Sequence, residues 1–179
     1  MTDATPVVAT PAAAGGGQRL HIPIQLRWGD LDAYNHVNNT AMLKLLEEAR
    51  VRALWTPAAG EDAPASAVLE GGQGSGVLTL VSRQEIEYLA PVPYQRHPLD
   101  VQMWFGNLGG SSFDVCYEVC SPRSDGGVES GGRQVVYARA TTVVVKVDAA
   151  SGRPLRLNAL EREAWAPYQG DPVRYAHRR

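Results

Sequence analysis

The sequence lacks any apolar run near the roughly 20 residues that a helix needs to cross a bilayer. It also lacks an excess of basic charge, since 17 Lys and Arg residues face 19 Asp and Glu residues, for a formal net charge of -2. These absences argue against an integral membrane protein and against broad, charge-driven binding of nucleic acid. With 44% hydrophobic and 20% charged residues over 179 positions, the chain is expected to form one globular domain.

Cysteine is scarce as well, since Cys116 and Cys120 are the only two. They lie four residues apart on a predicted strand, so their Cα atoms would be about 13 Å apart. A disulfide requires less than roughly 7 Å, and two sulfurs fall short of a zinc site. We therefore expect reduced thiols, no bound metal and a cytoplasmic protein.

Glycine and proline, in contrast, are abundant, with 18 and 12 residues. They concentrate in 1–17, 57–76 and 124–132, which predicts a disordered N-terminal tail, a long connection and a flexible hairpin loop. The folded domain is expected to span residues 18–170, followed by a C-terminal tail over 171–179.

The remaining residues follow strand and helix patterns. Apolar and polar residues alternate over 20–28, as in a half-buried strand. Pro23 lacks an N–H, which predicts that this strand lies at a sheet edge or leaves its N–H side unpaired there. Apolar residues at helical spacing, ended by Pro57, predict a helix over 40–55. Further strands are expected over 77–90, 98–108, 111–121 and 134–148, and a short helix over 158–168.

These last four strands follow one another along the chain, which predicts a meander-like antiparallel sheet. The strand over 134–148 is apolar on both faces and should be central. The helix is apolar nearly all round, so we expect a strongly curved sheet to wrap it. One helix packed against such a sheet is an α+β architecture.

The densest cluster of polar side chains lies in the loop before this helix, and it consists of Asp30, Asp32, His36, Asn38 and Asn39. Free N–H groups and the positive dipole end at a helix start can stabilise an oxyanion. A nearby carboxylate can activate water or attack directly, so the arrangement suits acyl transfer. Asp and Asn are also the preferred residues of turns and caps, so the spacing alone leaves a purely structural loop open.

The stretch LRWGDLDAYNHVNNTAMLKLLEEAR, residues 26–50, resembles the opening motif of the hotdog-fold acyl-CoA thioesterases of the 4-hydroxybenzoyl-CoA thioesterase family. The similarity continues weakly to residue 165, through Ile86–Val92, Leu108–Phe113 and Ser151–Pro154. The resemblance implies a hotdog fold, in which a curved five-stranded antiparallel sheet wraps a long central helix. It also implies hydrolysis of acyl-CoA to a free carboxylic acid and CoA, assisted by a carboxylate and needing neither metal nor cofactor.

The resemblance assigns roles to the loop residues. Asp32 corresponds to the catalytic carboxylate, which acts as a general base toward water or as a nucleophile. The backbone N–H near Asn39 would hold the thioester oxygen. His36 is a further candidate for the catalytic site, and with Asn38 it would shape the loop or the substrate pocket. Asp30 would accept hydrogen bonds from backbone N–H groups of the loop.

The sequence departs from the family pattern at two positions. Asn35 stands where a glycine is usual, and asparagine tolerates a positive φ less freely. Met42 stands where a tyrosine is usual. A second branch of hotdog thioesterases uses a helix glutamate, and Glu47 and Glu48 keep that alternative open. Both are more simply interpreted as ion-pair or helix-surface groups, with Arg50 and Arg52 as nearby partners.

Coenzyme A carries phosphates, so the resemblance implies a small basic surface near the pocket, with Arg83, Arg96, Arg139 and Arg153 as candidates. Gly110, Ser111 and Ser112 could approach the pantetheine or a phosphate through backbone N–H groups, or could simply form a hairpin turn. The pocket of the family resembles a cleft between subunits, so we expect a homodimer or homotetramer.

Two other functions stay open on the same fold. One is a hydratase or dehydratase acting on acyl thioesters, in which His36 could serve as an acid or base. The other is a non-catalytic protein that binds acyl-CoA.

Overall fold

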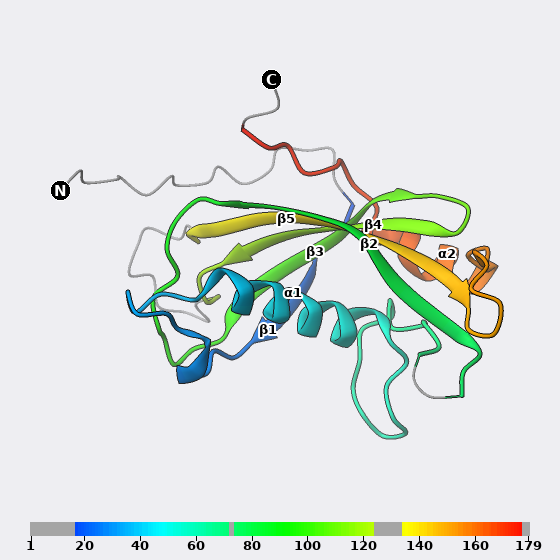
Figure 1. Cartoon of the computed structure of the whole chain (residues 1–179), viewed down its shortest axis with the longest axis horizontal. Coiled ribbons are helices and arrows are strands. Elements are labelled where there is room, and N and C mark those ends of the chain that lie inside the picture. The colour runs from blue at the N-terminus through cyan, green and yellow to red at the C-terminus, as the bar shows by residue number, and fades with distance from the viewer. Residues whose placement is uncertain (1–16, 72–73, 124–133, 177–179) are drawn as a thin grey trace.

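The computed structural model describes residues 17–71, 74–123 and 134–176. Within them, one curved five-stranded sheet carries a long helix along one face (Figure 1). The strands are β1 (Leu20–Ile24), β2 (Val77–Tyr88), β3 (Leu99–Leu108), β4 (Ser112–Cys120) and β5 (Val136–Asp148). The helices are α1 (Asn39–Leu54) and α2 (Ala159–Trp165), with 3₁₀ turns η1 (Trp28–Asp30) and η2 (Ala166–Tyr168). The predicted α+β architecture is confirmed.

The strand order is β1-β3-β4-β5-β2, and all neighbours are antiparallel. The expected meander is wrong for β2, which pairs with β5 rather than with β3. Residues 89–98 contain three prolines and carry the chain from β2 at one edge toward β3 near the other edge. A connection of this length does not impose the adjacent pairing that a tight turn imposes. β3, β4 and β5 do follow one another, β5 is an interior strand, and β1 with Pro23 is an edge strand, as predicted.

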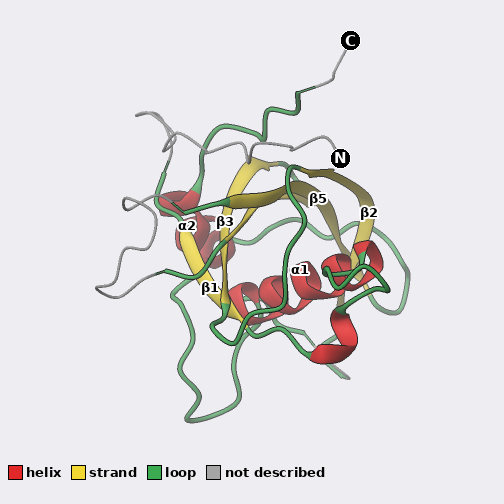
Figure 2. Cartoon of the chain, turned by 90° about the vertical axis from the view of Figure 1, so that its left-hand side faces the viewer, coloured by secondary structure: helices red, strands yellow, loops and turns green. Residues whose placement is uncertain are grey.

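Helix α1 lies beneath the arch of the sheet (Figure 2). The Asn38 side chain caps it by accepting a hydrogen bond from the Thr40 N–H at 2.8 Å. The residues that face the sheet are buried, and they include Met42, Leu45, Leu46, Ala49 and Ala53. The opposite face is exposed at Lys44, Glu47, Glu48 and Arg52. The predicted long helix wrapped by a curved five-stranded sheet is confirmed, although α1 is polar on its outer face and not apolar nearly all round.

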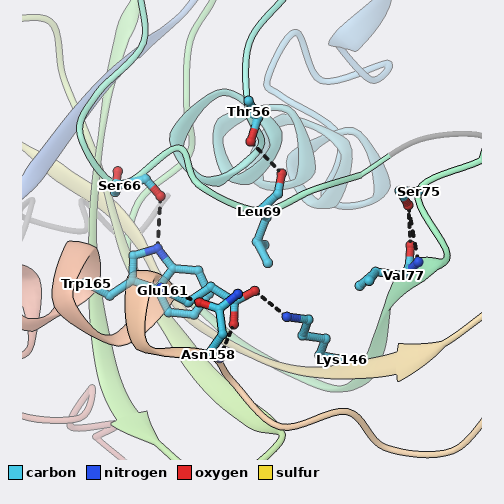
Figure 3. Close-up of polar contacts among 9 residues, drawn as sticks. All are labelled: Thr56, Ser66, Leu69, Ser75, Val77, Lys146, Asn158, Glu161 and Trp165. Atoms are coloured by element: carbon cyan, nitrogen blue, oxygen red, sulfur yellow. Dashed lines mark hydrogen bonds and ion pairs between the residues drawn. The ribbon is translucent and has the colours of Figure 1, made fainter.

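Helix α2 closes the core at the C-terminal end of α1. The Trp165 indole stacks on Phe105 with ring centroids 4.8 Å apart. Its N–H donates to the Ser66 carbonyl at 2.9 Å (Figure 3). The Ser66 hydroxyl donates to the Ala53 carbonyl near the end of α1 at 2.7 Å. The predicted connection over 57–76 is thus fixed to both helices.

A buried ion pair joins α2 to the sheet, because Lys146 of β5 contacts Glu161 of α2 (Figure 3). Glu161 also accepts a hydrogen bond from the Asn158 N–H at 2.8 Å, and so completes a capping box at the start of α2.

The last described residues lie on the face of the sheet opposite α1 (Figure 1). Of the predicted C-terminal tail, residues 171–176 pack there, where the Tyr175 hydroxyl donates to the Thr141 hydroxyl at 2.8 Å. Of the predicted N-terminal tail only Gly17 is described, and its N–H donates to the Gln169 carbonyl at 3.0 Å. Residues 1–16, the predicted loop over 124–132 and residues 177–179 lie outside the described part of the chain. No described helix is long and apolar enough to span a membrane.

Candidate active site

The loop between η1 and α1 is closed by its own backbone. The Asp32 N–H donates to the His36 carbonyl at 2.9 Å, and the Asn35 N–H donates to the Asp32 carbonyl at 3.0 Å. This tight turn places Asn35 at a φ of 62°, the one positive φ outside glycine among the described residues. Asparagine tolerates this left-handed region better than most residues. It therefore serves where the family pattern has glycine.

The carboxylate of Asp32 points back into this turn. Its Oδ1 accepts hydrogen bonds from the backbone N–H groups of Tyr34 at 2.8 Å and His36 at 3.3 Å. No group of the described chain donates a hydrogen bond to Oδ2, and the residue is half-exposed. One oxygen thus fixes the orientation of the carboxylate, and the other is free to act on a water or a substrate. The described contacts of His36 involve its backbone.

Asp30 and Asn38 hold the loop together. Asp30 is buried, and its Oδ2 accepts a hydrogen bond from the Arg27 N–H at 2.7 Å. The carbonyl of Asp30 accepts from the Asn38 N–H at 2.8 Å. The expected structural role of Asp30 is therefore confirmed, and the Asn38 side chain is occupied as the cap of α1.

Asn39 is the first residue of α1, so its N–H has no acceptor within the helix. Its carbonyl accepts a hydrogen bond from the Tyr88 hydroxyl at 3.1 Å, and burial raises the pKa of Tyr88. Tyr88 ends β2, and just beyond it the Val92 carbonyl accepts from the Val37 N–H at 2.9 Å. The sequence analysis gives Tyr88 no role, although Tyr88 belongs to the Ile86–Val92 run that resembles the family. The structure shows that this run positions the Asp32 loop and the helix start.

Gly110, Ser111 and Ser112 lie at the predicted β3–β4 hairpin turn, at the far end of the molecule from Asp32. The Leu157 N–H donates to the Gly110 carbonyl at 2.8 Å, which holds the hairpin against the segment that leads into α2. This region adjoins the C-terminal end of α1, whose 16 residues span about 24 Å. Figure 1 shows the Asp32 loop and α2 at opposite ends of α1. One chain therefore does not bring the hairpin to the Asp32 loop.

Exposed aromatic side chains surround the Asp32 loop. Tyr34 is 82% exposed and Trp28 is 71% exposed, and the Trp28 ring packs edge-on against Tyr94 with centroids 5.4 Å apart. Exposed aromatic clusters of this kind indicate a surface that a ligand or a partner covers.

The four candidate phosphate-binding arginines differ in their surroundings. Arg83 and Arg139 each form an ion pair with a neighbouring glutamate, at 2.7 and 3.1 Å. Arg96 and Arg153 are exposed, and neither forms an ion pair within the described residues. Arg96 lies two residues after Tyr94, whose ring contacts Trp28 beside the Asp32 loop.

The helix glutamates pair as expected. Glu48 Oε1 lies 2.7 Å from Arg52 Nε, and Glu47 Oε1 lies 3.7 Å from Arg50 Nη2. Glu47 also lines a cavity of about 180 Å³ between α1 and the sheet, so the helix-glutamate alternative keeps a geometric basis. The described residues contain no cluster of three or more His, Cys, Asp or Glu side chains that could hold a metal ion.

A family model described as the thioesterase-like superfamily matches residues 26–164. The chain belongs to this superfamily. It is a thioester hydrolase with the hotdog fold, and the resemblance on the loop motif is confirmed. The sequence matches no curated protein.

Solved structures agree with this family. The PA2801 protein of Pseudomonas aeruginosa, described as a thioesterase, is 29% identical; the match covers 82% of this chain and 95% of that one, with a TM-score of 0.59. A Xanthomonas campestris protein described as an acyl-CoA thioesterase is 26% identical over 73% and 93% of the two chains, with a TM-score of 0.53. A variant of 4-hydroxybenzoyl-CoA thioesterase bound to 4-hydroxybenzoyl-CoA shares the fold, with a TM-score of 0.61 and 14% identity. The match covers 82% of this chain and 98% of that one.

Proposed function

We propose that this superfamily member hydrolyses acyl-CoA thioesters and that Asp32 is the catalytic carboxylate. The observation that carries the proposal is the Asp32 side chain, which the Tyr34 and His36 N–H groups hold in the loop just before Asn39, the first residue of α1. The acyl-CoA substrate is supported by the Xanthomonas campestris relative, which is described as an acyl-CoA thioesterase.

The reaction needs one activated water and one oxyanion site. As a general base, Asp32 takes a proton from water while the water oxygen bonds to the thioester carbonyl carbon. The Asn39 N–H and the positive end of the α1 dipole stabilise the resulting oxyanion. The C–S bond then breaks, CoA leaves as a thiolate that takes up the proton, and the free acid remains. As a nucleophile, the Asp32 carboxylate would instead bond to the thioester carbonyl carbon, the C–S bond would break to release CoA thiolate, and water would cleave the resulting anhydride to the free acid and the Asp32 carboxylate.

The site is proposed to be completed by a second copy of the chain. The outer edge of β2 pairs with no other described strand, and Leu78, Leu80 and Val81 on it are 45%, 52% and 45% exposed. A long edge strand with exposed apolar side chains favours association. We expect a homodimer, or a homotetramer made of two such dimers. In it, the β3–β4 hairpin turn of one chain, which contains Gly110, could lie beside the Asp32 loop of the other chain.

Release of free thiol from a panel of acyl-CoA thioesters tests the proposed function. We expect thiol release with turnover, unchanged by a metal chelator. Acyl-CoA binding without thiol release would instead identify a binding protein, and hydration of an unsaturated acyl-CoA without thiol release would identify a hydratase. Single turnover in oxygen-18 water separates the two roles of Asp32. A general base places the label in the released acid, whereas a nucleophile whose anhydride water cleaves at the Asp32 carbonyl places the label in the Asp32 carboxylate and leaves the first acid unlabelled. The cytoplasmic location stays a prediction, consistent with two buried, unpaired cysteines.

A further inference from the structure

A charged side chain lies inside the helix–sheet interface of this otherwise apolar core. Arg50 is 9% exposed, and its Nη1 donates to the Tyr117 hydroxyl at 3.1 Å. Tyr117 is fully buried in β4, and burial raises its pKa above the ordinary value. A guanidinium remains charged under all ordinary conditions. Burying it is costly unless an anion and hydrogen-bond acceptors compensate the charge.

The compensation within the described chain is incomplete. The nearest carboxylate is that of Glu47, whose Oε1 lies 3.7 Å from Arg50 Nη2, beyond hydrogen-bond distance. The Glu47 side chain is 65% exposed, so water screens this pair. The Tyr117 hydroxyl is neutral. Arg50 is thus a buried cation, and its counter-ion, the Glu47 carboxylate, is mostly exposed to solvent.

Arg50 borders the cavity of about 180 Å³ between α1 and the inner face of the sheet. Apolar side chains line part of the cavity, among them Leu54, Val81, Phe113 and Val144, and the charged side chains of Arg50 and Glu47 also border it. A pocket that combines apolar walls with a few convergent polar groups is typical of a site that binds an apolar ligand with a specific polar end. The charge and the walls together fit an alkyl chain that ends in a carboxylate.

We propose that this cavity receives the far end of the acyl group and that Arg50 selects acyl chains ending in a carboxylate. The proposal rests on the proposed acyl-CoA hydrolysis. Arg50 lies eleven residues after Asn39, which is about 16 Å along the helix. The acyl chain would therefore run along α1 from the thioester at the helix start, and Glu47 would turn to solvent when the ligand carboxylate binds. A buried polar group that stays unpaired with a neutral chain disfavours that chain.

The test compares dicarboxylic thioesters with neutral thioesters of the same length. kcat/KM is measured for adipoyl-, suberoyl- and sebacoyl-CoA against hexanoyl-, octanoyl- and decanoyl-CoA. The variant is Arg50→Met. The matched control is Arg52→Met, which removes an exposed arginine two residues further along the same helix. In the wild type we expect a preference of about tenfold or more for the dicarboxylic member of at least one pair. Arg50→Met should lose this preference, and Arg52→Met should keep it.

A preference that is absent from the wild type, or unchanged in Arg50→Met, would overturn the proposal. If Arg50→Met does not fold, Tyr117→Phe takes its place, since it removes only the hydroxyl that holds the guanidinium. It should lower the same preference severalfold, and an unchanged preference would count against the proposal.

Calorimetric binding of free suberate and octanoate separates this proposal from the proposed function. Suberate should bind more tightly than octanoate to the wild type, and Arg50→Met should abolish the difference, even if no thioester is hydrolysed. Absence of thioester hydrolysis with this binding pattern intact would reject only the proposed function. Equal binding of the two acids by the wild type would reject the role of Arg50.

Discussion

The Tyr88 hydroxyl donates to the carbonyl oxygen of Asn39 at 3.1 Å, so the end of β2 is tied to the first residue of α1. The Asn39 N–H is the proposed oxyanion donor, and this bond limits how the first helical turn can move. A strand residue far away in sequence thereby helps to fix the geometry of the helix start.

Tyr88→Phe should lower kcat severalfold and cost about 0.5–1.5 kcal/mol of stability. Thiol release and urea unfolding measure the two effects. Because burial raises the folded-state pKa of Tyr88, its proton contributes stability that is present below the ordinary value near pH 10 and is lost as pH rises through the folded value. The wild type should therefore lose more stability than Tyr88→Phe between about pH 9 and about pH 11. Equal losses would contradict the role of the Tyr88 proton.

Asn35 should accept glycine and reject a β-branched residue, because its φ is 62°. We expect Asn35→Gly to keep full activity, and Asn35→Val to cost about 1–2 kcal/mol and to lower kcat by distorting the Asp32 turn. Thermal unfolding and the thiol assay on both variants check this expectation. An Asn35→Val variant as active and as stable as the wild type would show that the turn does not need a left-handed residue.

Removing one partner of the buried Lys146–Glu161 ion pair should lower the free energy of unfolding more than removing both partners does. Lys146→Met should cost about 3–5 kcal/mol, because it leaves the Glu161 carboxylate buried and unpaired. Adding Glu161→Gln should recover at least half of this loss, because glutamine can still accept the Asn158 N–H. Urea unfolding of both variants measures the difference, and a double variant no more stable than Lys146→Met would refute this account.

Cys116 and Cys120 should be inert in the native protein. Both are buried, and burial raises the pKa of Cys116 and raises that of Cys120 to about 12. At about pH 8 the reactive thiolate is therefore scarce. Mass spectrometry after iodoacetamide treatment should find neither cysteine alkylated in the native protein and both alkylated in urea. Rapid native alkylation would show that the face of the sheet opposite α1 opens readily.

Local patterns predicted the local structure. The loop motif with Asp32 and Asn38 was read from adjacent residues, and its turn and cap form through contacts within a few positions. The pairing of β2 with β5 joins residues about sixty positions apart, and alternation along one strand carries no information about its neighbour. The sequence predicts a surface ion pair for Arg50, because helical spacing gives the side of a helix on which a residue lies but not which side the sheet covers, and the structure buries it. Tyr88 was missed for the same reason, since its partner Asn39 is close only after folding.

The most direct measurement of the central claim is kcat of Asp32→Asn on the best acyl-CoA substrate, with Asp62→Asn as a matched exposed-carboxylate control. The substitution keeps the size of the side chain and an oxygen able to accept the Tyr34 N–H, and it removes the base or nucleophile. We predict that kcat falls by about a hundredfold or more, with an unchanged melting temperature and with Asp62→Asn as active as the wild type. An Asp32→Asn enzyme with wild-type kcat would contradict the assignment of Asp32 as the catalytic carboxylate.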